Sequence, residues 1–165
     1  MKGIIIYKSK YGSTKQFSEW LQAETGFNLY EITQCPADIK NYDTIVIGSS
    51  IHGGRIALGE WIIGHWEFIK DKRVVLMLTS GSGDSRNIQR VFEQSLPENI
   101  RKSLVLFPVG GRYIFKKMSL FDRTAIQVVA AFTKHPEAKK GMLTQRDEVR
   151  KENLSELINY ITFKV

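Results

Sequence analysis

Apolar and polar positions follow two different rhythms along this chain of 165 residues. Short, almost uninterrupted apolar runs are typical of strands buried on both faces, and they predict strands at 3–7, 27–32, 43–48, 73–78 and 103–109. Elsewhere, apolar residues recur at helical spacing, with stripes in 17–21, 58–69, 88–92, 118–132 and 154–161. The alternation predicts an α/β protein whose parallel sheet is covered by helices on both faces.

The sequence predicts a single domain over residues 1–165, because no internal repeat, low-complexity tract or linker divides it. No apolar run approaches the ~20 residues that span a bilayer, and the N-terminus has no basic region leading into a cleavable apolar stretch. The single cysteine, Cys35, fits a reducing compartment and lies beside Pro36, where we expect a loop rather than a nucleophile. We therefore expect a cytoplasmic protein.

The first strand runs into a short, hydroxyl-rich loop, residues 9–14, and then into a helix. Free backbone N–H groups and the positive end of the helix dipole favour an anion at such a turn, and Gly12 permits the positive φ of a tight turn. The hydroxyls of Ser9, Ser13 and Thr14 are further donors to a phosphate. The alternative is that Ser13 or Thr14 only caps the helix. The loop matches neither the Walker A nor the Gly-x-Gly-x-x-Gly pattern.

Three further segments rich in glycine and small polar residues follow the third, fourth and fifth strands, at 48–55, 79–84 and 109–113. In a parallel sheet, ligands bind outside the carboxyl ends of the strands. Small residues there let backbone amides approach a flat ligand closely. A phosphate loop together with a planar, hydrogen-bonding site fits flavin mononucleotide (FMN).

The chain resembles the flavodoxins, whose phosphate loop is similar to residues 9–14. The run from Gly48 to Gly54 and the pair Arg112-Tyr113 resemble the menaquinone-dependent protoporphyrinogen oxidases, which are basic peripheral membrane flavoproteins of porphyrin biosynthesis. The resemblance implies a three-layer, doubly wound, five-stranded parallel sheet of order 2-1-3-4-5, noncovalent FMN, and electron transfer from a porphyrinogen to a quinone. It also implies an inserted basic helical segment, 112–146, after the fifth strand.

The resemblance assigns roles to particular positions. Residues 9–14 would hold the phosphate, 49–54 would run along the flavin ring, and 79–84 would contact its pyrimidine edge through main-chain groups. Tyr113 either stacks on the ring or is an ordinary core or surface tyrosine. His52 is a candidate proton shuttle, or an exposed loop histidine without a task. The residues expected to contact the cofactor are Ser9, Lys10, Tyr11, Gly12, Ser13, Thr14, Ser49, Ser50, Ile51, His52, Gly53, Gly54, Thr79, Ser80, Gly81, Ser82, Gly83, Asp84, Arg112 and Tyr113.

The net charge of +7 is concentrated in the segment 112–146, where eight basic residues face two acidic ones. Its apolar stripe either packs on the body, leaving solvated lysines, or forms a lid that faces anionic lipid or an anionic porphyrinogen. No stacking platform or recognition motif accompanies the charge, which argues against nucleic acid. The histidines His52, His65 and His135 show no metal-ligand spacing, so we expect no metal, and His65 fits a packing role on its apolar stripe.

Two alternatives to a quinone-linked oxidoreductase stay open. One is a non-enzymatic electron carrier that docks to a protein redox partner. The other is a binding or regulatory module that has lost its flavin, against which the hydroxyls and glycines of the loops argue.

The charge balance predicts the redox behaviour of a bound flavin. Acidic residues around a flavin disfavour its negatively charged reduced form, whereas a basic segment stabilises that form. We expect the second reduction step to have a higher potential than in acidic flavodoxins. Potentiometric titration measures this directly, and a second potential as low as theirs would contradict the hypothesis.

Overall fold

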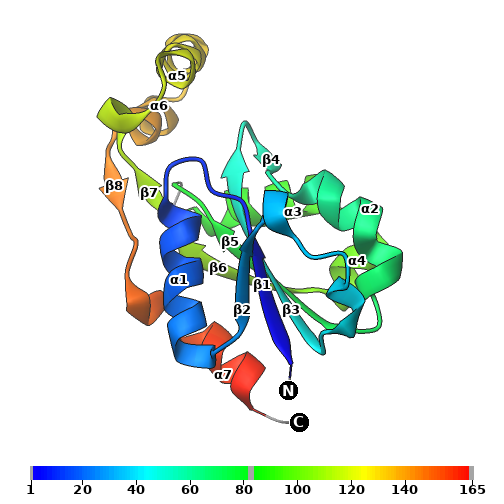
Figure 1. Ribbon diagram of the computed structural model, residues 1–165. Coiled ribbons are helices and arrows are strands. Elements are labelled where there is room, and N and C mark those ends of the chain that lie inside the picture. The colour runs from blue at the N-terminus through cyan, green and yellow to red at the C-terminus, as the bar shows by residue number, and fades with distance from the viewer. Residues whose placement is uncertain (1, 82–83, 164–165) are drawn as a thin grey trace.

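The computed structural model describes residues 2–81 and 84–163 and shows a central sheet with helices on both faces (Figure 1). The sheet contains β1 (Gly3–Tyr7), β2 (Asn28–Glu31), β3 (Thr44–His52), β5 (Arg73–Thr79) and β6 (Val105–Gly110). These strands are parallel and lie in the order β2-β1-β3-β5-β6, which confirms the predicted five-stranded order. A short strand, β4 (Arg55–Ile56), pairs antiparallel with β3.

Two groups of helices complete the three layers. Residues of α1 (Ser13–Thr25) and α7 (Ser155–Thr162) pack on one face of the sheet. Residues of α2 (Gly59–Ile69), α3 (Ser85–Ser95) and α4 (Glu98–Ser103) pack on the other. The sequence pattern did not predict α4, whose six residues follow Pro97 and carry only one buried side chain, Ile100.

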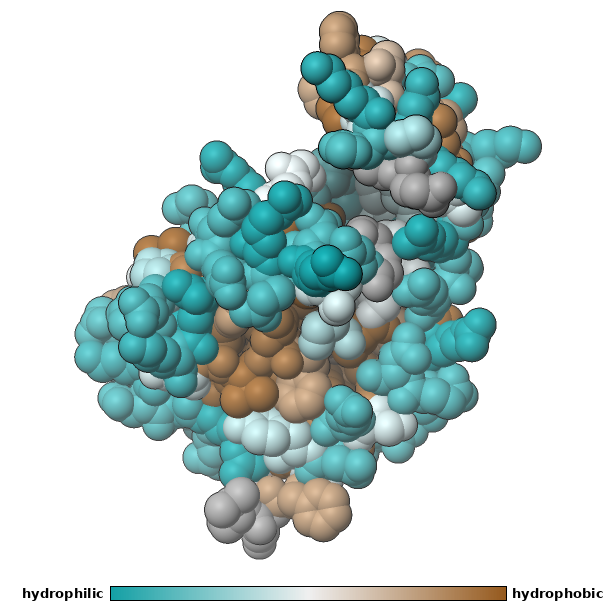
Figure 2. All heavy atoms as spheres, turned by 180° about the vertical axis from the view of Figure 1, so that it is seen from behind, coloured by the Kyte–Doolittle hydropathy of each residue, from teal (hydrophilic) through white to brown (hydrophobic). Residues whose placement is uncertain are grey.

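After β6 the chain leaves the body and returns to it. It runs through β7 (Arg112–Tyr113), a 3-10 turn (Phe115–Lys117), α5 (Leu120–Phe132) and α6 (Pro136–Leu143), and comes back along β8 (Arg146–Asp147). β7 and β8 pair antiparallel, and α5 packs against α6. Together they form a projection beyond the carboxyl ends of the strands (Figure 1). Seen from behind, its tip bears apolar surface among polar side chains (Figure 2).

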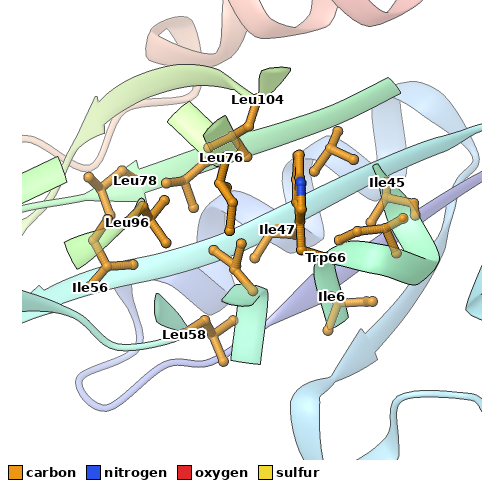
Figure 3. Close-up of a cluster of buried hydrophobic side chains, with 14 of the residues drawn as sticks. Ile6, Ile45, Ile47, Ile56, Leu58, Trp66, Leu76, Leu78, Leu96 and Leu104 are labelled. Atoms are coloured by element: carbon orange, nitrogen blue, oxygen red, sulfur yellow. The ribbon is translucent and has the colours of Figure 1, made fainter. Parts of the chain in front are cut away.

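Alternation along the strands divides the core into two clusters. Ile4 and Ile6 of β1 belong to the cluster under α2 and α3, whereas Ile5 belongs to the cluster under α1 and α7. The same alternation separates Ile47 from Val46 on β3. Figure 3 shows the first cluster, where isoleucine and leucine side chains from the strands meet Trp66 of α2. Burial on both faces explains why these strands form apolar runs rather than alternating ones.

The segment after the third predicted strand is not a loop. β3 continues to His52, because Ser49 and Ser50 pair with β5 and His52 pairs with Arg55 of β4. Gly53 and Gly54 form the two-residue turn of this hairpin, with φ of 58° and 74°. Two consecutive positive φ values are what a tight hairpin turn requires.

Within the described residues, no helix is both long enough and apolar enough to cross a bilayer.

Candidate functional site

A cavity of about 350 Å³ lies at the carboxyl ends of the parallel strands, and we call it the cofactor cleft. Fourteen of the predicted contact residues line it: Ser9, Lys10, Tyr11, Ser13, Thr14, Ser50, Ile51, His52, Gly53, Thr79, Ser80, Gly81, Arg112 and Tyr113. Gly12, Ser49, Gly54 and Asp84 do not line it, and Ser82 and Gly83 fall outside the described residues. The structure therefore brings most of the four predicted segments to one place.

The loop at the start of α1 has the backbone that an anion site requires. Gly12 is the N-cap of α1, with φ 88°, and its N–H donates to Ser9 Oγ over 3.1 Å. The first amides of α1 have no carbonyl partner within the helix and lie beside Ser13, which lines the cleft. Neither Ser13 nor Thr14 caps the helix, so the capping alternative is wrong.

The Thr14 hydroxyl has a structural role instead of the expected phosphate contact. Its oxygen lies 2.8 Å from Thr79 Oγ1, and the Thr79 hydroxyl donates to the carbonyl of Ser49 over 3.2 Å. A hydroxyl carries one hydrogen, so Thr14 donates to Thr79 and has none left for a phosphate. Ser49 is also committed: it is fully buried, and its Oγ accepts the Leu58 amide at 3.0 Å. The prediction that the Thr14 hydroxyl donates to the phosphate is therefore corrected, whereas the predicted place of Ser49 beside the flavin ring stays a prediction.

A buried carboxylate from α5 reaches the phosphate loop. Asp122 Oδ2 accepts a hydrogen bond from Lys10 Nζ at 2.7 Å and a short one from the Tyr11 hydroxyl. His52 Nε2 lies 3.6 Å from Asp122 Oδ1 and 3.1 Å from Lys10 Nζ. Asp122 has a relative exposure of 8%. We call Lys10, Tyr11, His52 and Asp122 the anchor, because it fastens α5 to the loop.

Sequence reasoning missed Asp122, although a signal was present. Ser119 and Asp122 have the Ser-x-x-acid spacing of a capping box, and the Ser119 hydroxyl does accept the Asp122 amide at 3.1 Å. In a complete capping box the acid would accept the N-cap amide. Here the Tyr11 hydroxyl accepts the Ser119 N–H at 3.4 Å, and the Asp122 carboxylate accepts a hydrogen bond from Lys10 instead. Only a tertiary structure shows this exchange.

The anchor changes the titration of its own charges. Hydrogen bonds from Lys10 and then from Tyr11 lower the pKa of Asp122 from 3.8 to about 2. The hydrogen bond to Asp122 raises the pKa of Lys10. Both shifts favour the ionised pair, so the ion pair persists through neutral and mildly acidic pH.

The other end of the cleft is formed by close backbone packing. A Cβ at Gly111 would lie 2.6 Å from the carbonyl oxygen of Ser80, so only glycine fits there. Tyr113 packs on Gly81, its hydroxyl donates to the carbonyl of Met142, and burial raises the pKa of that hydroxyl. Arg112 lines the cleft, but its Nε is paired with Asp147 at 2.8 Å.

Two other side chains lie as the sequence pattern predicts. His65 is half-buried and stacks on Trp61, with ring centroids 4.3 Å apart. Cys35 is partly buried, and burial raises the pKa of its thiol, which disfavours the thiolate that a nucleophile requires.

The apolar stripe of α5 does not pack on the body as one alternative held. Asp122 and Ala130 are the buried residues of α5, whereas Phe121 and Phe132 are each 81% exposed and Leu120 is 78% exposed. Phe121, Ala125 and Ile126 of α5 line the cofactor cleft together with Met118, which precedes the helix. The helix therefore covers the cleft with one part of its surface and leaves most of its apolar residues in solvent.

The topology and the cleft define an α/β protein with a site for a phosphate-bearing, planar cofactor. A family model described as "Flavodoxin domain" matches residues 4–140, and the chain belongs to that family. Among solved structures, a flavoprotein from Lactobacillus acidophilus NCFM in complex with FMN is 19% identical, with 66% of this chain and 91% of that chain covered and a TM-score of 0.50. The Trp repressor binding protein from Bacillus subtilis is 13% identical, with 88% and 100% covered and a TM-score of 0.53. No curated protein compared with the chain matches it.

FMN is the cofactor that this family and this cleft define, and the residues present fit it. Its phosphate would lie at the first turn of α1, where the Ser9 hydroxyl keeps a hydrogen to donate after accepting from Gly12. Its ring would lie between the β3–β4 hairpin and the residues 79–81, where Gly53 and Gly81 line the cleft with no side chain of their own. The anchor side chains lie at the phosphate end of the same cleft.

The anchor predicts how α5 responds to mutation. Asp122→Asn removes the charge that holds Lys10 and Tyr11, and we expect faster hydrogen exchange over 115–132 with little change in the midpoint of global unfolding, because α5 buries so little. The matched control is Glu67→Gln, which removes an exposed ion pair with Lys70 on α2. Exchange in α5 that is unchanged in Asp122→Asn would contradict the role of the anchor.

The pH dependence follows from the sign of the Asp122 shift. A carboxyl whose pKa is lowered by folding stabilises the fold above its ordinary pKa of 3.8 and loses that contribution as the pH falls toward 2. We expect the exchange of α5, corrected for its intrinsic rate, to be flat from pH 7 to 5. A rise within this range would mean that a group other than Asp122 controls the anchor.

Proposed function

We propose that this protein is an FMN-dependent oxidoreductase that oxidises a porphyrinogen and reduces a quinone. The observation that carries the proposal is a second cavity, of about 840 Å³, beside the cofactor cleft. The two cavities share Ile51, Gly53, Ser80, Gly81 and Tyr113 and both reach α5. An electron carrier that docks through an exposed cofactor edge needs no such space next to it.

In this proposal the cofactor transfers the electrons, and the chain binds and orients the reactants. FMN accepts an electron pair from one compound and gives it to another. Each oxidation removes two electrons and two protons from a C–H and N–H pair of the macrocycle, and the quinone gains them as a quinol. The chain binds and orients: residues 9–14 hold the phosphate, the hairpin and residues 79–81 flank the ring, and α5 excludes water above it. His52, held by Lys10 and near Asp122, stays a candidate for moving a proton.

The assignment is tested in two steps on one preparation. Protein purified without added cofactor should retain flavin absorbance after gel filtration. It should then convert protoporphyrinogen to fluorescent porphyrin anaerobically, only when a soluble menaquinone analogue is present. A carrier would retain flavin but show no porphyrinogen-dependent quinone reduction without its partner. A module that has lost flavin would retain none.

A glycine pair supplies the matched control for the cofactor step. Gly12→Ala places a side chain on a backbone with φ 88°, which costs about 1–2 kcal/mol and disturbs the phosphate amides, so FMN affinity should fall about five- to thirtyfold. Gly64→Ala, on an open part of α2, should retain FMN as the wild type does. Equal retention by both variants would place the phosphate elsewhere.

We further propose that α5 places the protein on an anionic membrane surface, where a lipid-soluble quinone is available. Exposed Leu120, Phe121 and Phe132 suit the interface between headgroups and acyl chains, and the basic residues of 112–146 suit anionic headgroups. The projection that carries α5 has apolar surface at its tip (Figure 2).

Vesicle sedimentation tests this contact. The protein should sediment with phosphatidylglycerol-rich vesicles, less with neutral ones, and less as salt rises. The double variant Phe121→Ser, Phe132→Ser should lose binding, whereas Phe68→Ser, at an exposed site on α2, should not. Equal loss in both variants, or no preference for anionic vesicles, would contradict the contact.

A further inference from the structure

The second cavity combines charge and apolar surface in a way the cofactor does not require. We call it the arginine pocket, because Arg86, Arg90 and Arg146 line it. Its walls also include the apolar side chains of Ile51, Ile126, Val129, Met142 and Tyr113. It lies between the β3–β4 hairpin, the first turns of α3, and the α5–α6 projection.

The three arginines come from two elements that are distant in sequence. Arg86 and Arg90 are four residues apart on α3, so their side chains are neighbours on one face of that helix. Arg146 lies on β8, where it pairs with Tyr113 of β7. The fold thus brings three guanidinium groups to one cavity next to the cofactor cleft.

The charge of these guanidinium groups is not balanced by neighbours. Among the side chains that the structure describes, which do not include that of Glu137, no carboxylate forms an ion pair with any of the three. Arg90 donates to the neutral amide of Asn87 at 2.8 Å. The one acidic residue of the lining, Asp84, accepts the Arg86 backbone amide as the N-cap of α3. The pocket therefore has a net positive charge.

Three arginines outside the pocket contact carboxylates or aromatic rings. Arg112 is paired with Asp147, Arg73 lies over the ring of Tyr160, and Arg123 lies over the ring of Phe115. Other arginines, such as Arg55 and Arg150, are also exposed without a carboxylate partner among the described side chains. What distinguishes the pocket is that three such guanidinium groups line one cavity.

The guanidinium groups and the apolar walls of the arginine pocket together indicate which class of ligand it would bind. A guanidinium group presents a planar fork of donors that matches a carboxylate, and apolar walls favour a hydrophobic body. We propose that Arg86, Arg90 and Arg146 form a subsite for the carboxylates of an apolar, ring-shaped substrate, whose ring system extends between α5 and the cofactor cleft. The proposal deepens the proposed function, on which it rests, by assigning the residues that select an anionic substrate.

Binding, rather than turnover, tests the subsite. The probe is protoporphyrin IX, which carries two carboxylates and cannot be oxidised further at this site, added to the full-length, FMN-loaded protein and followed by its absorbance shift. Its dimethyl ester has the same ring without the charges. We expect the diacid to bind at least tenfold more tightly than the ester, with affinity that falls as salt rises.

Three single variants, Arg86→Gln, Arg90→Gln and Arg146→Gln, are each expected to weaken diacid binding about tenfold and to leave ester binding unchanged. All three should retain FMN, because none of these residues lines the cofactor cleft. Arg150→Gln, at an exposed position outside both cavities, is the control for a loss of one positive charge. Equal thermal midpoints establish that the variants are folded.

The outcomes separate the subsite from the oxidase assignment. Diacid binding that depends on the arginines, without any oxidation of porphyrinogen, supports the subsite and overturns the proposed activity. If the protein oxidises porphyrinogen but binds the diacid and the ester equally, the subsite alone is overturned. The same holds if it oxidises porphyrinogen and the three variants bind the diacid as tightly as the wild type does. Equal weakening by Arg150→Gln would show a general charge effect and also overturn it.

Discussion

Every chemical feature of this molecule depends on one constraint, the parallel pairing of five strands. Parallel strands end at the same edge of a sheet, so the segments after β1, β3, β5 and β6 meet there although they are distant in sequence. The apolar runs that bury both faces of the sheet fix this arrangement. The loops at the edge are then free to carry small and polar residues, because they contribute little to the core.

Sequence reasoning predicted the parts of the structure that depend on local pattern. The run Ile4 to Ile6 is buried on both faces and therefore shows no alternation, which identifies a central strand. The sequence places a glycine, which permits a positive φ, at position 12, and Gly12 has a φ of 88°. The boundary of β3 was missed because Ser49 and Ser50 look like loop residues, whereas their backbone pairs with β5 and the Ser49 side chain holds the start of α2.

What sequence could not provide is the pairing of residues far apart in the chain. Lys10 and Asp122 are separated by 112 positions, and nothing in either neighbourhood indicates that they meet. In the sequence, Asp122 looks like the acid of a capping box, which would accept the Ser119 amide. In the structure, the Tyr11 hydroxyl accepts that amide instead. The same holds for the arginines of α3 and β8. In the sequence each looks like a solvated surface charge, and they line one cavity because the pairing of β7 with β8 returns the chain to the body.

The way α5 is attached has a physical consequence for the cleft that it covers. A helix held by apolar packing is released only by exposing that surface to water, which makes it part of the core. α5 is held chiefly by the charged and polar contacts of Asp122, while Phe121 and Phe132 are solvent-exposed. Polar contacts exchange with water at a small net free energy, so the cover can separate from the cleft while both core clusters stay intact. Lys10 thus contributes both to the loop that would hold the phosphate and to the ion pair that holds the cover in place.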